Sequence, residues 1–499
     1  MAAELELLLR ARYPLIWLVT AEERRAIELT CAIARTTGDA VAGWSSTWGV
    51  HDLPASPLAG AHKDPLALLE HVRKQERRTI WVLKDMGALL AGAENPALVR
   101  ALRDTAQVAK ERGSVLLCVG PVDRLPASLE GDAAVHHLAL PTAADHDQQL
   151  LQVAQHLGLR LDPADRELLT TACLGLSLEQ AENIWARVRA AGGRFTSDDV
   201  RQVLAEKGRI VRASGYLDLV SPASLDQVGG LDVLKRWLQQ RQLGYSERAR
   251  SIGLPWPRGA LLVGVQGCGK SLIARAVAGQ WRQPLLRMDV GGLMEGYVGA
   301  SERNLRRAMQ LAERIAPCVL WVDEIEKAFA GLSTSNDGGT ISRMFGTMLT
   351  WMQEKDSPVF VLATANDIEG LPPELIRKGR FDEVFFIDLP DTAQREEIWT
   401  VHLAARARAS GDKLLLDRLD LAGLAALSEG YSGAEIAAAI IEGAFEALAR
   451  GQPLTGDHLA AAISASPPLS RTRAESIDRL RAWAEGRARR ASSTTAPTR

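Results

Sequence analysis

The 499-residue sequence lacks several features that would define its class at once. Its five cysteines (Cys31, Cys118, Cys173, Cys268 and Cys318) have neither a paired spacing nor the spacing of metal ligands, which argues against a disulfide framework and against a zinc site. Neither charge dominates, because 59 Lys and Arg face 61 Asp and Glu. The charge balance therefore gives no reason to expect binding to nucleic acid.

Signals for export or membrane insertion are also missing. The N-terminal stretch 1–19 places acids ahead of its apolar residues and has no basic start, unlike a secretory signal. No apolar run approaches the roughly 18 residues needed to cross a bilayer. The composition, with 46% hydrophobic and 24% charged residues, is typical of globular proteins. The length suggests three or four domains of roughly 100–200 residues each. We therefore expect a soluble, cytoplasmic protein.

Short apolar strands alternate with helical stretches along most of the chain, which is typical of an α/β fold with parallel sheets. The alternation covers residues 1–211 and again 226–470. Between them, the stretch 212–225 contains Gly, Pro and Ser and is interpreted as a linker. The segment 471–499 holds eight Arg against three acids and ends in ASSTTAPTR, so we expect a short basic helix and a disordered tail.

The two halves of the sequence resemble each other. Five short segments recur in the same order at nearly constant spacing, which indicates an internal duplication. The alternative is two unrelated α/β domains with chance matches. The paired segments are PLIWLVT (14–20) with ALLVGV (260–265), IWVLKD (80–85) with LWVDE (320–324), LPASL (125–129) with LPPEL (371–375), LALPTAADHDQQL (138–150) with IDLPDTAQREEIW (387–399), and FTSDDV (195–200) with LTGDHL (454–459).

The strongest motif is GVQGCGKS, which fits the phosphate-loop pattern G-x-x-x-x-G-K-[ST] and lies between an apolar strand and a helix pattern. Its glycines let backbone N–H groups turn towards phosphate oxygens, and the helix N-terminus adds partial positive charge. Lys270 is expected to reach the β- and γ-phosphates of ATP, and the Ser271 hydroxyl to bind Mg²⁺. A glycine-rich turn without function is the alternative. The predicted loop residues are Gly264, Val265, Gln266, Gly267, Cys268, Gly269, Lys270 and Ser271.

Two later apolar strands end in polar residues that suit phosphoryl transfer. Asp323 and Glu324 follow the strand VLWV, where Asp323 is expected to hold Mg²⁺ through its water shell and Glu324 to act as general base on the attacking water. Asn366 ends the strand VFVLATAN, and its amide is expected to contact the γ-phosphate or the water. Alone, each pattern is more often a solvated strand end or a turn, but their positions after the phosphate loop favour the catalytic interpretation.

Arg377 and Arg380 flank a tight turn in the sequence RKGRFD, just after the strand of Asn366. An exposed arginine pair is normally a solvated surface. An arginine supplied by a neighbouring subunit can, however, neutralise charge on the transferring phosphoryl group. That role requires an oligomer whose contacts close into a ring.

These motifs, together with DQVGGL (226–231) and GYSGAEI (430–436), resemble the successive landmarks of the AAA ATPase family. The resemblance implies a P-loop nucleotide domain over 226–390 and a helical lid over 391–470. It also implies ATP and Mg²⁺ as cofactors and a homo-oligomeric ring, with six subunits as the family expectation. Further positions carried over are Val228 and Gly229 at the adenine, Gly433 and Ala434 in the lid, and Tyr297 and Val298 in a central pore loop. Packing of Tyr297 in its own subunit is the alternative.

The first half departs from the family pattern at the positions that carry chemistry. After its opening strand it reads Thr20-Ala-Glu-Glu-Arg-Arg25, without glycine and without Lys-Ser. A loop without glycine cannot turn its N–H groups inward, and two glutamates repel a triphosphate. We therefore expect residues 1–211 to be a degenerate, non-hydrolysing AAA-like domain used for docking or ring assembly. A purely stabilising role is the alternative.

The whole chain, with GVQGCGKS in place of the common GPPGTGKT, resembles a group of AAA proteins encoded in algal plastids, cyanobacteria and other bacteria. That group is linked in cyanobacteria to regulating inorganic-carbon use. The leading hypothesis is an ATP-hydrolysing ring that remodels a protein partner. An ATP-dependent switch that controls a metabolic enzyme is the alternative. A DNA-acting AAA protein is disfavoured by the even charge and by the lack of a helix-turn-helix or zinc-finger pattern.

Overall fold

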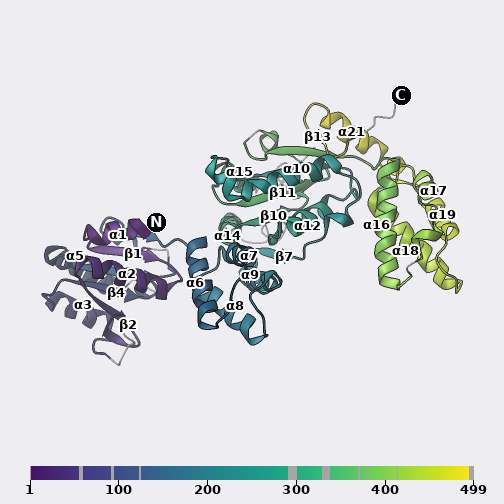
Figure 1. Ribbon diagram of the computed structural model, residues 1–499. Coiled ribbons are helices and arrows are strands. Elements are labelled where there is room, and N and C mark those ends of the chain that lie inside the picture. Colours follow the sequence, from purple (N-terminus) through teal and green to yellow (C-terminus); the bar gives the residue numbers. More distant parts are fainter. Residues whose placement is uncertain are drawn as a thin grey trace. The chain divides into compact units, whose positions relative to one another are not determined.

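The computed structural model of the chain describes residues 2–54, 60–91, 95–122, 125–289, 300–328, 338–368, 371–377, 379–412 and 414–493. It forms two compact units, each built on its own sheet (Figure 1). The first unit spans residues 1–161 and 176–194, and the second spans 162–175 and 195–499. No helix among these described residues combines the length and apolar character needed to span a membrane.

The first unit is a six-stranded sheet covered by helices on both faces. Its strand order is β3-β2-β4-β5-β1-β6, and only β3 runs antiparallel to its neighbour. Ile16 and Leu18 pack under α1 and α2, whereas Leu15 and Trp17 pack under α3, α4 and α5. The elements are α1 (Ala2–Arg10), β1 (Leu15–Val19), α2 (Glu23–Thr37), β2 (Ala40–Ser45), β3 (Gly49–Asp52), α3 (Pro65–Lys74), β4 (Thr79–Lys84), α4 (Met86–Ala91), α5 (Pro96–Arg112), β5 (Val115–Gly120), β6 (Ala134–His137), α6 (Ala143–His156) and α8 (Leu178–Ala190).

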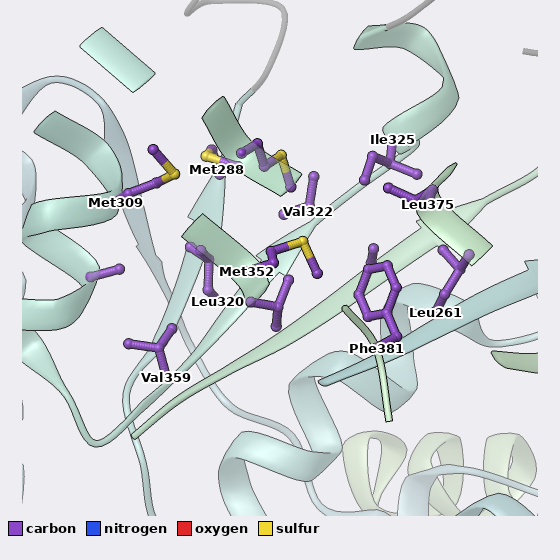
Figure 2. Packing of buried hydrophobic residues seen from close by; sticks show 14 of the residues in the cluster. Leu261, Met288, Met309, Leu320, Val322, Ile325, Met352, Val359, Leu375 and Phe381 are labelled. Carbon is purple, nitrogen blue, oxygen red and sulfur yellow. The ribbon is translucent and has the colours of Figure 1, made fainter. Parts of the chain in front are cut away.

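The second unit contains a seven-stranded sheet in the order β13-β12-β8-β11-β10-β9-β7, with β7 antiparallel. Ala260 and Leu262 of β8 face α10 and α12. Leu261 and Val263 face α14 and α15, and Figure 2 shows Leu261 in the same cluster as Met309 of α14 and Met352 of α15. The elements of this part are α7 (Pro163–Cys173), α9 (Val200–Ser214), β7 (Leu217–Val220), α10 (Asp232–Gln242), α11 (Glu247–Ser251), β8 (Gly259–Gly264), α12 (Lys270–Trp281), β9 (Leu285–Met288), α14 (Ala300–Ile315), β10 (Cys318–Val322), α15 (Gly338–Glu354), β11 (Val359–Ala365) and β12 (Glu383–Ile387).

The remaining helices form a small lid with its own apolar core, followed by a C-terminal segment that returns to the sheet. Trp399, Leu403 and Ile436 lie at the centre of the lid core. The elements are α16 (Thr392–Ser410), α17 (Leu421–Leu427), α18 (Gly433–Ala449), α19 (Gly456–Ala465), α20 (Leu469–Thr472), α21 (Ala474–Ala484) and β13 (Arg489–Arg490). The structure therefore has the expected α/β class, with a parallel-rich sheet and a helical lid preceded by a second α/β sheet.

The two sheets share one topology. Numbered in chain order and without the two-residue β13, the parallel strands lie in the order 5-1-4-3-2 in both, as β6-β1-β5-β4-β2 and as β12-β8-β11-β10-β9. Each sheet also carries an antiparallel strand beside strand 2, namely β3 and β7. The shared order is what an internal duplication predicts and is hard to reconcile with two unrelated domains.

Two segments differ from the sequence-based prediction. The predicted linker 212–225 contains the end of α9 and the strand β7, because Leu217 and Leu219 pack against the core of the second unit. The predicted tail is attached to the same unit as far as residue 493. There Leu480 of α21 is buried, and the N–H of Ala491 donates to the Phe386 carbonyl at 3.0 Å.

Helices α7 and α9 belong to the second unit, so its boundary does not coincide with residue 211. On α9, Lys207 is 1% exposed and its Nζ donates to the Ile315 carbonyl at the end of α14, at 3.2 Å. The neighbouring thiols of Cys173 and Cys318 are buried as well, which raises each pKa to about 12. Burial lowers the pKa of Lys207 to about 8.

The lowered pKa of Lys207 makes stability depend on pH. Between pH 8 and the ordinary lysine pKa of 10.5, Lys207 binds its proton more fully in the unfolded chain, so its own contribution to the unfolding free energy rises with pH. We predict that Lys207→Met loses this rise of about 3 kcal/mol, since the pKa of Lys207 is lowered from 10.5 to about 8 and each pKa unit is worth roughly 1.4 kcal/mol. Denaturant titrations of the wild type and of Lys207→Met between pH 8 and 10.5 measure the difference in unfolding free energy. Lys74→Met, which changes an exposed lysine, is the control. A difference that does not change with pH would contradict the prediction.

Candidate functional site

The strand order gathers the predicted motifs at one edge of the second sheet. Strand β11 pairs in parallel with β8 on one side and with β10 on the other. The phosphate loop follows β8, Asp323 and Glu324 follow β10, and Asn366 follows β11. Because parallel strands end at the same edge, the three motifs meet there.

The phosphate loop has the compact backbone that its glycines predict. Gly267 and Gly269 have φ values of 78° and 89°, a region that favours glycine. Helix α12 begins at Lys270, whose Nζ donates to the carbonyls of Gly264 and Val265 at 2.7 and 2.8 Å. Burial of this side chain lowers its pKa to about 8. The loop therefore closes around the lysine, with the N-terminus of α12 behind it.

Asp323 is held from two sides by hydroxyl groups. Thr364 Oγ1 of β11 donates to Asp323 Oδ1 at 2.5 Å, and Ser271 Oγ lies 3.5 Å from the same oxygen. The serine hydroxyl and the aspartate carboxylate are oxygen donors of the kind that Mg²⁺ prefers. The two residues predicted to hold the metal thus face each other across the start of α12.

Glu324 has a constrained backbone and a fully engaged side chain. Its φ of 48° lies in the left-handed region, and its N–H donates to Thr364 Oγ1 at 3.0 Å. Asn366 Nδ2 donates to Glu324 Oε1 at 3.0 Å, while Lys327 forms an ion pair with Oε2. The N–H of Asn366 donates to Glu326 Oε1 at 2.9 Å, and burial raises the pKa of Glu326. The predicted base and the predicted amide are therefore in direct contact.

The lid contacts the phosphate loop at the N-terminus of α18. The N–H of Ala434 donates to the Gly267 carbonyl at 3.0 Å, and a Cβ on Gly433 would lie 3.4 Å from the same oxygen. Gly229 lies against the first lid helix, where a Cβ would come within 2.7 Å of the Ile398 side chain. Gly433 and Ala434, which are predicted to approach the nucleotide, therefore contact the phosphate loop. Gly229 and the buried Val228 lie beside the first helix of the lid.

The two arginines lie elsewhere. Asp382, in the same turn, donates its N–H to the carbonyl of Gly259, the first residue of β8. The turn is therefore at the opposite end of β8 from the phosphate loop, about 20 Å away at roughly 3.3 Å per residue. Arg380 donates to the Glu374 carbonyl, and Arg377 is exposed. The predicted pore-loop residues Tyr297 and Val298 lie outside the described residues.

The matching edge of the first sheet has the opposite arrangement of charge. Helix α2 begins with Glu23 where α12 begins with Lys270, and β4 ends with Lys84 where β10 is followed by Asp323. Lys84 Nζ and Glu23 Oε1 pair at 2.9 Å. A nearby hollow of about 310 Å³ is lined by two arginines and five acids, Arg24, Arg25, Glu22, Glu28, Asp145, Glu179 and Glu182, among other residues. At this edge the lysine is paired with a glutamate, and acids outnumber arginines in the hollow, so the charges suit a phosphate group less well than those of the second sheet.

The sequence reasoning missed Thr364, Glu326 and Lys327. Thr364 is 1% exposed and lies two residues before Asn366, so a polar residue inside an otherwise apolar strand was the available signal. Glu326 and Lys327 follow Glu324 in the short helical turn Ile325–Ala328, and nothing in their spacing distinguishes them from a charged surface.

Known sequence families match four parts of the chain. Residues 260–389 match the ATPase family associated with various cellular activities (AAA), and residues 418–460 match the AAA+ lid domain. The first half matches the SpoVK-like AAA ATPase N-terminal domain over residues 1–138 and its second domain over 144–214.

Known proteins are similar to this chain over nearly all of its length or over part of it. The AAA domain-containing protein ycf46 of Pyropia yezoensis is 36% identical over 98% of this chain and 99% of its own length. The protein of the same name in Guillardia theta is 38% identical over 96% of this chain and 94% of its own length. The ATP-dependent zinc metalloprotease FtsH 1 of Symbiobacterium thermophilum is 33% identical over 60% of this chain and 50% of its own length. The chain belongs to the AAA ATPase family.

The contacts of Thr364 predict its effect on turnover. Thr364→Val keeps the shape but removes the acceptor of the Glu324 N–H and the shorter of the two hydroxyl bonds to Asp323 Oδ1, a loss of about 1–3 kcal/mol for a buried group left without its partner. We expect hydrolysis to fall by about tenfold or more, at 1.36 kcal/mol per factor of ten, with nucleotide affinity much less affected. Thr364→Ser, which retains the hydroxyl, should recover most of the rate. Equal rates for the two variants in a steady-state ATPase assay would contradict this role.

Proposed function

We propose that the chain is a Mg²⁺-dependent ATPase that hydrolyses ATP at the edge formed by β8, β10 and β11. The observation that carries the proposal is the convergence of the loop lysine, the Ser271–Asp323 pair and the Glu324–Asn366 pair at that edge. Membership of the AAA family supports the same activity. The family relation also supports a homo-oligomeric ring, with six subunits as its usual number.

The proposed roles follow from the positions of the side chains. The loop N–H groups and Lys270 bind the phosphates, and Ser271 and Asp323 hold Mg²⁺, which when bound neutralises phosphate charge. Glu324 takes the proton of the attacking water, and Asn366 orients the glutamate through its amide. The contact between Ala434 and Gly267 supports closure of the lid over the nucleotide.

We further propose that the ring acts on a protein partner and that residues 1–211 do not hydrolyse ATP. The reversed pair of Lys84 and Glu23 supports the second point. The FtsH relatives, named ATP-dependent, support energy use, but the sequence contains no His-Glu-x-x-His, so we do not extend proteolysis to this chain. Docking or ring assembly is the proposed use of the first half.

Binding and hydrolysis can be separated by two substitutions. Lys270→Ala should abolish ATP binding, because the phosphate charge loses its direct partner. Glu324→Gln should bind normally but hydrolyse about 10²–10⁴-fold more slowly, the range for a lost general base. Equilibrium binding of a fluorescent ATP analogue and phosphate release measure the two effects.

The same titration tests the first half of the chain. The wild-type protein should bind one nucleotide per chain and Lys270→Ala none. A second saturable site that persists in Lys270→Ala would show that residues 1–211 bind nucleotide and would overturn the proposed degeneracy.

The remote position of the arginines predicts catalysis between subunits. Arg380→Ala should bind ATP nearly normally yet hydrolyse it poorly, since a trans arginine contributes up to about 10³–10⁵ in rate. Activity per subunit of the wild type should rise with protein concentration. Mixing Arg380→Ala with Lys270→Ala should restore partial activity, because some intact loops then lie beside intact arginines. No restoration in rings shown to be mixed, with activity independent of concentration, would rule out the trans arginine.

A further inference from the structure

Lys327 holds the proposed catalytic base from the side opposite to Asn366. Its backbone N–H donates to the Glu324 carbonyl at 2.9 Å, so the turn Ile325–Ala328 fixes where its side chain begins. From there the ammonium group forms an ion pair with Glu324 Oε2. Since Asn366 Nδ2 donates to Oε1, both carboxylate oxygens of Glu324 have a partner.

The surrounding charges make this pair more than an incidental surface contact. Three acids, Asp323, Glu324 and Glu326, lie near Lys327, and they raise the pKa of its ammonium group, chiefly through the bond to Glu324. The other cation of the site, Lys270, donates to loop carbonyls and not to these acids. In the part of the chain that the structure describes, Lys327 is the one basic side chain that forms an ion pair with this acidic trio.

The backbone of Glu324 leaves little freedom to avoid the pairing. Its left-handed φ of 48° and its N–H bond to Thr364 fix the direction in which the side chain leaves the strand. A carboxylate that acts as general base must present an oxygen to the attacking water. Here each oxygen already has a partner, so both pairings compete with the attacking water for the orientation of the Glu324 carboxylate.

We propose that Lys327 is a positioning residue that restrains Glu324 in a resting orientation and thereby lowers the basal rate of hydrolysis. The inference rests on the proposed ATPase function and adds a residue to it. Lys327 is the partner suited to withdraw, since its side chain is 73% exposed and reaches the pair from solvent. Asn366 is held in place by its N–H bond to Glu326.

The expected effect is modest, because an exposed ion pair is a weak restraint. Lys327→Met should raise kcat at saturating ATP by about two- to fivefold, without change in the dissociation constant for ATP. Lys327→Arg, which keeps the charge, should return kcat to near the wild-type value. A merely structural role for Lys327 would lower kcat or stability in Lys327→Met and would not separate kcat from binding.

A matched control exists in the lid. Arg450 and Glu446 form a similar short ion pair on α18, with side chains 60% and 31% exposed, against 73% and 33% for Lys327 and Glu324. Arg450→Met removes a comparable surface pair away from the site and should leave kcat unchanged. The double variant Glu324→Gln/Lys327→Met should show no gain over Glu324→Gln, because the restraint acts only through the carboxylate.

The outcomes separate the restraint from the proposed function. If the wild type hydrolyses ATP above the Glu324→Gln background but Lys327→Met is equally fast or slower with normal binding, the restraint is wrong and the ATPase assignment stands. If neither the wild type nor Lys327→Met exceeds that background, the proposed hydrolysis fails, and the restraint with it. If turnover is higher in Lys327→Met and near the wild-type value in Lys327→Arg, both the restraint and the proposed ATPase function are supported.

Discussion

The candidate site depends on one feature of the second sheet, the position of β11 between β8 and β10. In the chain β11 comes after all of β8, β9 and β10, yet it pairs with the first and the third of them. Its pairing with β10 brings Thr364 to Asp323 and Asn366 to Glu324, and its pairing with β8 places the phosphate loop beside them. In a sheet with strands in chain order, β9 and β10 would separate β8 from β11, and the phosphate loop would lie away from the polar residues that end β11.

The first unit has the same strand order, but the charged residues at the matching edge have the opposite signs. Both sheets carry apolar residues on their two faces, where the helices cover them. Burial of these faces stabilises the strand order and does not involve the residues at the carboxyl ends of the strands. The edge residues are then free to differ, and Lys84 with Glu23 replaces the acid and lysine of the second unit. The two units therefore share a strand order but differ in the charges at this edge.

The parts of the structure that depend on local patterns could be predicted from the sequence, and those that depend on distant contacts could not. The apolar strands, the phosphate loop and the residues that end β10 and β11 are visible as motifs. Thr364 is not, because threonine is common in strands and its two hydrogen bonds are made to another strand. Likewise, β7 and the segment near Ala491 look polar and loop-like, and only the edge of the sheet that each joins makes them ordered.

The C-terminal segment, residues 469–493, constrains the lid, and nothing in its sequence predicts this. Within the second unit, the N–H of Leu469 donates to Glu435 of the lid at 2.8 Å, and Arg481 binds both oxygens of Asp388, directly after β12. Further on, Ser493 donates to Asp232 at the start of α10. The segment is thus bonded to the lid at one end and to the nucleotide domain at the other. Any change in the angle of the lid over the phosphate loop must bend this segment or break one of these bonds, so the lid and the C-terminus cannot move independently.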